Sequence, residues 1–197
     1  MRIGILGGSF NPCTKGHIKV ADMVLKQGFV DQVWLMPNFV HNLGKLSADA
    51  LHRVEMLHRS IKGKKNLVVC LHEVNKETDG KLYNTMSELI DTYPHIIFSC
   101  IIGMDCALEI NNWYNWKNLI EEYPFIVVNR QGYDWESNKD NPMWFECEPH
   151  IIIKDKTKHE YSSTLARKAI KNKDNNLQER LMYRSVIDYI KINELYQ

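Results

Sequence analysis

The chain has 197 residues, of which 44% are hydrophobic and 25% charged, and its formal net charge is +1. These values are ordinary for a globular protein with room for a hydrophobic core, and we expect residues 1–197 to form one domain. A net charge so close to zero excludes the strongly basic class of protein that binds nucleic acid or a membrane surface through its overall field. Any bound anion must therefore be held by local geometry.

The cysteines occur at positions 13, 70, 100, 106 and 147. Their odd number and the lack of a C-x-x-C pair are typical of reduced cysteines, so we expect a cytosolic compartment, with a nuclear one left open. Cys70 and Cys100 lie in apolar runs and are predicted to be core residues. No apolar run approaches the ~18 residues of a membrane span, and the first strand begins too early for a cleaved signal peptide.

Short apolar runs alternate with amphipathic stretches along the chain. We expect strands at residues 3–6, 33–36, 67–71, 96–102, 125–128 and 151–153. We expect helices at residues 17–27, 48–61, 83–93, 163–172 and 177–192. The helix at 48–61 should turn inward its residues Leu51, Val54, Leu57 and Ile61, and the helix at 83–93 its residues Met86, Leu89, Ile90 and Tyr93.

Strands that alternate with helices predict right-handed crossovers and a parallel sheet covered on both faces. The expected fold class is therefore α/β, a doubly wound parallel sheet with C-terminal helices. Ligands in such sheets bind at the carboxyl ends of the strands, near the point where the strand order reverses. We interpret residues 131–149 as a loop insertion.

The loop at residues 7–17 joins the first strand to the first helix and has the features of a phosphate site. Gly7 and Gly8 allow a ligand to approach the backbone closely. The helix begins near Gly16, so its free N–H groups and positive dipole end face the same space. Thr14 and His17 are three residues apart and can both face a ligand there.

A second candidate anion site lies at residues 161–167. Ser162 or Ser163 can cap the helix that follows, which leaves the N–H groups of Ser163 and Thr164 pointing at an anion. Arg167 lies four residues after Ser163 and so shares its helix face, from which it can bind phosphate oxygens. The simpler alternative for both segments is a tight turn and a capped helix without a ligand.

These two segments carry a family resemblance. Residues 14–17 read T-K-G-H and resemble the [HT]-x-G-H signature of the nucleotidylyltransferase superfamily, and residues 7–12 resemble the G-G-[ST]-F-D-P that precedes it. Residues 161–167 resemble the I-S-S-T-x-I-R of the same superfamily, with Tyr161 and Ala166 in place of two isoleucines. The resemblance implies a Rossmann-like nucleotidylyltransferase fold.

Further segments narrow the resemblance to the nicotinate and nicotinamide mononucleotide adenylyltransferases, nearest to the bacterial nicotinate type. The matching patterns are I-I-G-x-D at 101–105, W-x-x-W at 113–116, R-x-x-M-L at 53–57, F-V-V-x-x-R-x-G-Y at 125–133 and V-x-x-Y-I…L-Y at 186–196. The function implied is transfer of the adenylyl group of ATP to nicotinate mononucleotide, and also to nicotinamide mononucleotide, with release of pyrophosphate. Two segments depart from the family: the P-P-H-[KR] after the second strand is F-V-H-N here, and S-Y-T-x-[DE]-T-L aligns poorly at 82–89.

By this resemblance, residues can be assigned to the two substrates. The ATP site would comprise Gly7, Gly8, Ser9, Phe10, Gly16, His17, Gly103, Asp105, Ser162, Ser163, Thr164 and Arg167. The mononucleotide site would comprise Asn11, His41, Lys45, Thr85, Trp113 and Arg130, with Lys45 in place of the missing basic residue and Trp113 stacked on the pyridine ring. Asp105, at the end of a strand, is suited to accept a hydrogen bond from a ribose hydroxyl.

The expected mechanism needs no general base. The attacking 5′-phosphate has a second pKa of ~6 and is mostly dianionic at neutral pH. The catalytic residues would be His17, donating to the α-phosphate, Thr14, assisting it, and Arg167, which with the amides of Ser163 and Thr164 holds the β- and γ-phosphates. Mg²⁺ would be held mainly by ATP and water, without protein ligands.

Two alternatives stay open on the sequence, and a third is disfavoured. Another T-x-G-H enzyme, such as a phosphopantetheine adenylyltransferase, shares the first motif, and a non-catalytic nucleotide-binding module could share the fold. A class I aminoacyl-tRNA synthetase has a similar H-I-G-H, but this chain lacks the K-M-S-K-S loop. The preferred mononucleotide, and whether the chain forms a homo-oligomer, are not decided by the sequence.

Overall fold

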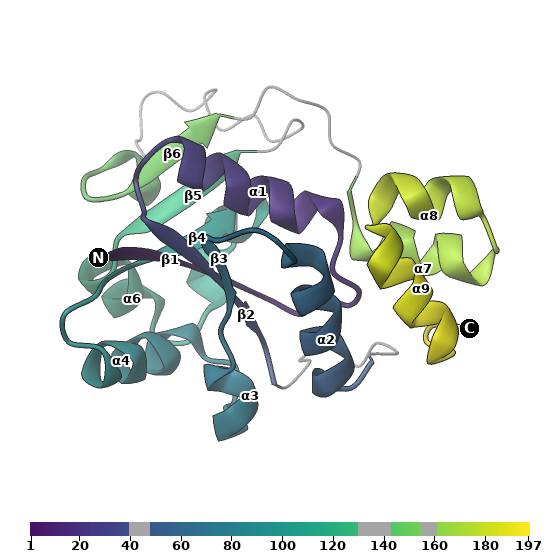
Figure 1. The fold of residues 1–197 in the computed structure, drawn as a ribbon. Helices are drawn as coiled ribbons and strands as arrows, with labels where there is room; N and C mark the ends of the chain where they lie inside the picture. Colours follow the sequence, from purple (N-terminus) through teal and green to yellow (C-terminus); the bar gives the residue numbers. More distant parts are fainter. Residues whose placement is uncertain (40–47, 130–142, 155–160) are drawn as a thin grey trace.

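The computed structural model describes residues 1–39, 48–129, 143–154 and 161–197, and within them the chain forms one six-stranded parallel sheet (Figure 1). The strands are β1 (Arg2–Gly8), β2 (Gln32–Pro37), β3 (Leu67–Val69), β4 (Ile97–Gly103), β5 (Phe125–Asn129) and β6 (Ile151–Lys154). Their order across the sheet is β3-β2-β1-β4-β5-β6, and every neighbouring pair is parallel. The predicted doubly wound α/β class and its strands are confirmed.

Helices connect the strands and cover both faces of the sheet (Figure 1). They are α1 (Lys15–Lys26), α2 (Ala50–Ile61), α3 (His72–Lys76), α4 (Leu82–Thr92), α5 (Met104–Leu108), α6 (Trp116–Glu122), α7 (Ser163–Lys171), α8 (Asn175–Leu181) and α9 (Arg184–Ile192), with 3₁₀ turns η1 (Ile110–Asn112) and η2 (Trp144–Glu146). The helices α7, α8 and α9 lie together at one end of the molecule, at the right of Figure 1. In the described part of the chain, no helix is long and apolar enough to cross a bilayer.

The alternation of side chains along each strand divides the core in two. One cluster joins alternate strand residues such as Leu6 and Ile101 to apolar side chains of α1, α2, α7, α8 and α9. The other joins Ile5 and Cys100 to side chains of α4, α5 and α6. Cys70 and Cys100 are both buried, as predicted. This two-sided burial explains why the central strands read as continuous apolar runs.

The predicted inward face of α2 is wrong at Leu51, which is 75% exposed. The buried residues of α2 are Arg53, Met56, Leu57 and Ser60. Residues 51 and 53 point about 200° apart around a helix, so the two cannot both face inward. The helix buries Arg53 because its guanidinium binds backbone carbonyl groups of the neighbouring loops, and Leu51 is turned to solvent as a result.

The predicted face of α4 needs a similar correction. Met86 and Leu89 are buried as expected, but Ile90 and Tyr93 are 39% and 41% exposed, and Thr85 takes the inward place. Thr85 is held there because its hydroxyl donates to a buried carboxylate on α3, a helix that the sequence pattern did not predict. The third strand correspondingly ends at Val69, ahead of α3.

The single helix predicted at 177–192 is wrong, because α8 and α9 are separate. Met182 has an extended backbone (φ −129°, ψ 159°) and is buried, so the chain turns there to place an apolar side chain in the core. The two tryptophans of the W-x-x-W segment lie in different local structures. Trp113 follows η1 in an extended conformation, whereas Trp116 begins α6.

The strand order reverses between β1 and β4. From β1 the chain proceeds to β2 and β3 on one side, and from β4 to β5 and β6 on the other. The two central strands end at Gly8 and Gly103, so their loops diverge and leave a crevice at this edge of the sheet.

Candidate functional site

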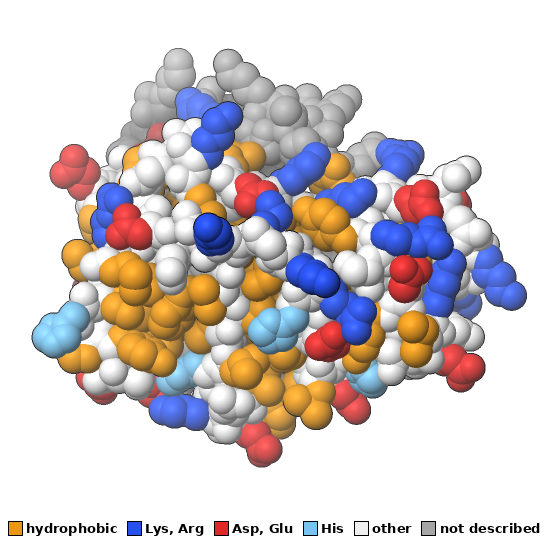
Figure 2. All heavy atoms as spheres, viewed as in Figure 1, with side chains coloured by type: hydrophobic (Ala, Val, Ile, Leu, Met, Phe, Trp, Pro, Cys, Tyr) orange, Lys and Arg blue, Asp and Glu red, His pale blue; other side chains and the backbone are white. Residues whose placement is uncertain are grey.

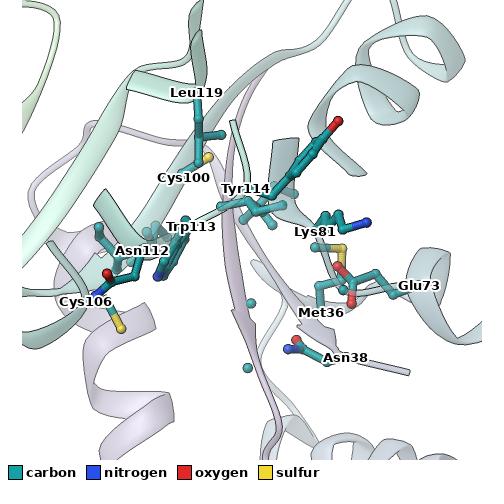
Figure 3. Close-up of a pocket in the computed structure, with 17 residues that line it drawn as sticks. Met36, Asn38, Glu73, Lys81, Cys100, Cys106, Asn112, Trp113, Tyr114 and Leu119 are labelled. Atoms are coloured by element: carbon teal, nitrogen blue, oxygen red, sulfur yellow. The ribbon is translucent and has the colours of Figure 1, made fainter. Parts of the chain in front are cut away.

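A pocket of about 400 Å³ opens at the carboxyl ends of β1, β2 and β4 (Figure 3). Gly7 and Gly8 of β1 form part of its wall, together with Asn38 after β2 and Ile102 of β4. The volume lies in the usual range for a small-molecule site. The pocket is therefore at the position that the doubly wound topology predicts for a ligand.

His17 is oriented by the residue that precedes α1. The Thr14 backbone N–H donates to His17 Nδ1 at 3.0 Å, and the Thr14 hydroxyl oxygen lies 3.0 Å from the same nitrogen. Because Nδ1 accepts a backbone hydrogen bond, the neutral imidazole must carry its proton on Nε2. The ring of Phe10 packs edge-on against the imidazole, with centroids 5.0 Å apart. This arrangement makes His17 a fixed Nε2–H donor.

The glycines of the first loop serve two different purposes. A Cβ at Gly7 would meet no atom of the described residues within 4 Å, and one at Gly8 would make an ordinary contact with Phe10. The space beside Gly7 is therefore open to a ligand. A Cβ at Gly16 would instead lie 2.5 Å from Tyr161 Cβ, which is an impossible distance. Gly16 is thus required for close packing of the second motif against the first.

The two motifs meet directly. The Ser163 hydroxyl donates to the Pro12 carbonyl at 2.9 Å, and Arg167 Nη1 donates to the Asn11 carbonyl at 2.6 Å. Arg167 Nη2 also donates to the Thr164 hydroxyl at 3.1 Å. Of the two candidate caps, Ser162 caps α7, because its side chain accepts from the Leu165 N–H at 3.1 Å. The helix start of α7 and the first loop thus form one connected surface.

A buried arginine, Arg53, holds the first loop to the loop that follows β2. Its guanidinium donates to the carbonyl oxygens of Ser9 at 2.9 Å, Asn38 at 2.6 Å and Ala48 at 3.1 Å. Burial lowers the pKa of Arg53, but a guanidinium stays charged at neutral pH. The backbone of Ser9, predicted to contact ATP, is therefore fixed from inside the protein.

Asn11 is fully buried, and its side chain is engaged within the protein. Asn11 Oδ1 accepts hydrogen bonds from the Tyr196 hydroxyl at 2.6 Å and from the Ala48 backbone N–H at 3.2 Å. The structure therefore gives Asn11 a part in holding the loop, in addition to the mononucleotide contact predicted from the sequence.

The walls of the pocket carry aromatic and polar side chains. Figure 3 shows the Trp113 indole on one side and Asn38 and Glu73 on the other. Tyr114 lines the pocket as well, and Lys81 Nζ lies 4.9 Å from the centroid of its ring. Trp113 and Trp116 both pack against the second core cluster, and Trp113 also lines the pocket, where its indole offers a flat apolar surface to a ligand ring.

Thr85 lies behind the pocket wall instead of on it. Its hydroxyl donates to Glu73 Oε1 at 3.0 Å, and both residues are buried. Burial raises the pKa of the Glu73 carboxyl, while the Thr85 hydroxyl and the Phe39 backbone oppose that rise. Glu73 Oε2 has no hydrogen-bond partner in the part of the chain that the structure describes. Glu73 therefore gives the pocket wall a buried carboxyl group that the sequence did not reveal.

Gly103 and Asp105 lie at the carboxyl end of β4. Gly103 is the residue before α5, and Asp105 is half-buried in the first turn of that helix. Neither lines the 400 Å³ pocket, although Ile102 and Cys106 on either side of them do. His41, Lys45 and Arg130, all assigned to the mononucleotide, lie outside the described residues.

Acidic and basic side chains are mixed over part of the protein surface. On the face drawn in Figure 2, Lys and Arg side chains are mixed with Asp and Glu over the C-terminal helices. Among the described residues, no group of three or more His, Cys, Asp or Glu side chains converges as a metal site would require. The donors around the first loop are N–H groups, which suit phosphate oxygens more than a cation.

Several lining residues were missed by the sequence patterns. Asn38 follows a predicted strand, so the rule that ligands bind at strand ends could have identified it. Tyr114 lies within the W-x-x-W segment. Glu73 and Lys81 had no such signal, because α3 is only five residues long and Lys81 precedes a helix in an unpredicted loop.

Comparison with known proteins gives matches over most or all of the chain. The family model described as cytidylyltransferase-like matches residues 5–169. The nicotinate-nucleotide adenylyltransferase of Bacillus subtilis is 32% identical over 198 residues, which cover 100% of this chain and 98% of that protein. A probable nicotinate-nucleotide adenylyltransferase of Streptococcus mutans is 34% identical, with 100% and 89% covered.

The fold also resembles a solved structure. The nicotinic acid mononucleotide adenylyltransferase of Plasmodium falciparum, complexed with NaAD, superposes with a TM-score of 0.81 at 23% identity, covering 99% of this chain and 97% of that one. This similarity supports the assignment of the fold.

Proposed function

Because the chain belongs to the cytidylyltransferase-like family and matches nicotinate-nucleotide adenylyltransferases over its whole length, we propose that it transfers the adenylyl group of ATP to nicotinate mononucleotide. The products are nicotinate adenine dinucleotide and pyrophosphate. One observation supports this proposal above the others: Arg167 and Ser163 of the second motif bind the backbone of the first loop, so both motifs face one site.

The site binds and orients two polyanions. An oxygen of the mononucleotide 5′-phosphate attacks the α-phosphorus of ATP, the bond from that phosphorus to the bridging oxygen breaks, and pyrophosphate leaves with the electron pair. The nucleophile is already ionised, so the protein needs no general base. Its task is to align the reacting groups and stabilise charge on the phosphoryl oxygens.

His17 is suited to this task because of its tautomer. Thr14 holds Nδ1, which leaves the proton of the neutral imidazole on Nε2. We assign this donor to the α-phosphate. Arg167 and the first amides of α7 are assigned to the β- and γ-phosphates, since a helix start attracts anions.

Mg²⁺ fits this site as a cation carried by the substrate. The residues around the first loop supply hydrogen-bond donors for phosphate oxygens, so the ion would be held by ATP and water and would neutralise the leaving pyrophosphate. The protein residues nearest to it would act on the phosphates, and none is assigned as a metal ligand.

The pyridine ring is assigned to the pocket between Trp113 and the loop after β2. An indole stacks well on a flat ring, and the remaining wall supplies polar groups for orientation. We extend the proposal to nicotinamide mononucleotide as a second acceptor. A single domain spanning residues 1–197 and a cytoplasmic location are part of the same proposal.

The test is pyrophosphate release from ATP and Mg²⁺ with four acceptors: nicotinate mononucleotide, nicotinamide mononucleotide, phosphopantetheine and none. We expect the highest kcat/KM with nicotinate mononucleotide. Turnover only with phosphopantetheine would replace this proposal with the related adenylyltransferase, and binding of ATP without turnover would indicate a nucleotide-binding module.

A single substitution tests the assignment of His17. His17→Ala should lower kcat by ~10²–10³-fold while the protein stays folded, as expected for the loss of one donor to a developing charge. A variant with unchanged turnover would refute the role of His17, even if the wild type proved to be the proposed enzyme.

A further inference from the structure

The hydroxyl of Tyr196, 185 residues from Asn11 in sequence, reaches the first loop. It donates to Asn11 Oδ1 at 2.6 Å, and the Ala48 N–H donates to the same oxygen at 3.2 Å. An amide oxygen can accept two hydrogen bonds, and these two donors supply both. Asn11 is fully buried, so its side chain is fixed in one orientation by these contacts.

This contact acts on the turn that leads to the proposed catalytic residues. The carbonyl of Asn11 accepts from Arg167, and the carbonyl of Ser9 accepts from Arg53. Tyr196 is therefore the third side chain that holds residues 9–11, and it does so from a part of the chain that neither motif includes. A displacement of this turn would move Thr14 and His17, which follow it within six residues.

The Tyr196 hydroxyl is suited to be a permanent donor. Burial raises the pKa of Tyr196 well above its usual range, and the nearby Arg167 and Arg53 only partly oppose this. The phenol therefore keeps its proton at physiological pH, and its bond to Asn11 persists.

We propose that Tyr196 is a positioning residue for the transfer reaction, acting through Asn11 to hold the loop that carries Thr14 and His17. This inference rests on the proposed function. Tyr196 touches no reacting atom in this scheme. It removes the freedom of a turn on which the alignment of the triphosphate depends, and small misplacements of reacting groups are costly.

The first experiment compares three variants in the C-terminal segment. Tyr196→Phe keeps the ring and removes only the hydroxyl, so we expect kcat/KM for ATP to fall about tenfold, with kcat lowered as well. Tyr189→Phe removes a hydroxyl that binds His52 on the outer side of α2, and should leave both parameters unchanged. Leu195→Ala weakens packing of the same segment and retains the Tyr196 hydroxyl.

Stability and positioning are separated by Leu195→Ala. All variants are assayed below their melting transitions, followed by circular dichroism. We expect Leu195→Ala to lower the melting temperature and to retain kcat/KM. The proposal is overturned if Tyr196→Phe has wild-type kinetics, or if Leu195→Ala loses as much activity as Tyr196→Phe.

A double-mutant cycle tests whether Tyr196 acts through Asn11. Asn11→Ala should itself be impaired, and adding Tyr196→Phe should cause little further loss, because the contact is already gone. Additive losses would show that Tyr196 acts by another route. Asn11→Ala also provides the measurement from the other partner if Tyr196→Phe does not fold.

This test remains informative if the proposed reaction is wrong. If the wild type releases pyrophosphate with none of the acceptors, the proposed function fails. The rise in melting temperature on adding ATP then reports on the loop. We expect a smaller rise in Tyr196→Phe than in Leu195→Ala, and equal rises would overturn the inference.

Discussion

Substituting Gly16 by alanine should separate the two motifs that form the proposed ATP site. The added Cβ would lie 2.5 Å from Tyr161 Cβ and 3.1 Å from its Cγ. Carbon atoms in contact need about 3.5–4.0 Å, so either α1 or the segment before α7 must move by about 1 Å. Tyr161 is next to the Ser162 cap, and Ser163 binds Pro12 at 2.9 Å, so this displacement should break the connection between the motifs.

The size of the effect follows from the overlap. Overpacking of this kind costs about 1–3 kcal/mol of unfolding free energy. A 1 Å misplacement of reacting groups can cost about 10²-fold in rate, so kcat/KM for ATP should fall by about that factor in Gly16→Ala. The measurements are a thermal melt and steady-state kinetics for both substrates.

Two further glycine variants control for this reasoning. In Gly4→Ala the added Cβ would also lie 2.5 Å from a carbon atom, but that atom is the terminal Cδ1 of Ile101, which can rotate away. It should lose stability without a large change in kcat. Combining Gly16→Ala with Tyr161→Gly removes both clashing atoms and should restore part of the activity. If Gly16→Ala keeps wild-type kcat/KM for ATP, the close approach of the motifs is not what assembles the site.

Two other predictions concern the pocket. Trp113→Ala should raise KM for the mononucleotide about tenfold and leave KM for ATP unchanged. Trp116→Ala loses core packing, so it should lower the melting temperature without changing KM for the mononucleotide. Similar KM values for the mononucleotide in both variants would argue against ring stacking. Glu73→Gln should alter the pH dependence of stability. Burial raises the pKa of Glu73 in the folded protein above its ordinary value of 4.5. The protonated carboxyl therefore contributes its full stabilisation of the folded state below about pH 4.5, and this contribution is lost as the pH rises through the folded pKa. The melting temperature of the wild type should therefore fall relative to Glu73→Gln across that window, and a constant difference between the two from pH 4 to pH 8 would contradict the raised pKa.

The strands were predictable because they are buried on both faces. Their apolar runs, such as residues 125–128, are short, β-branched and followed by amphipathic stretches. The helix faces were less predictable, because apolar periodicity alone cannot foresee that Arg53 would be the inward residue of α2. That choice depends on carbonyl groups of loops distant in sequence.

The same distinction applies to the site. Local motifs indicated Thr14, His17, Ser162 and Arg167, and the structure brings their segments together. Glu73 could not be predicted, and the family pattern at 186–196 includes Tyr196 without indicating its role, because the importance of both arises from single contacts to residues distant in the chain. The assignments to His41, Lys45 and Arg130 fall outside the described residues and stay predictions.

The extended residue between α8 and α9 has a consequence for the whole site. An unbroken helix over residues 177–192 would be about 24 Å long and would carry the following segment in a straight line away from the sheet. After the turn at Met182, α9 packs against α2. The Ser185 hydroxyl donates to the Arg59 carbonyl at 3.3 Å, and the Tyr189 hydroxyl lies 2.8 Å from a ring nitrogen of His52. A buried methionine side chain thereby determines that Tyr196 returns to the first loop, so a substitution at Met182 could affect adenylyl transfer without approaching either substrate.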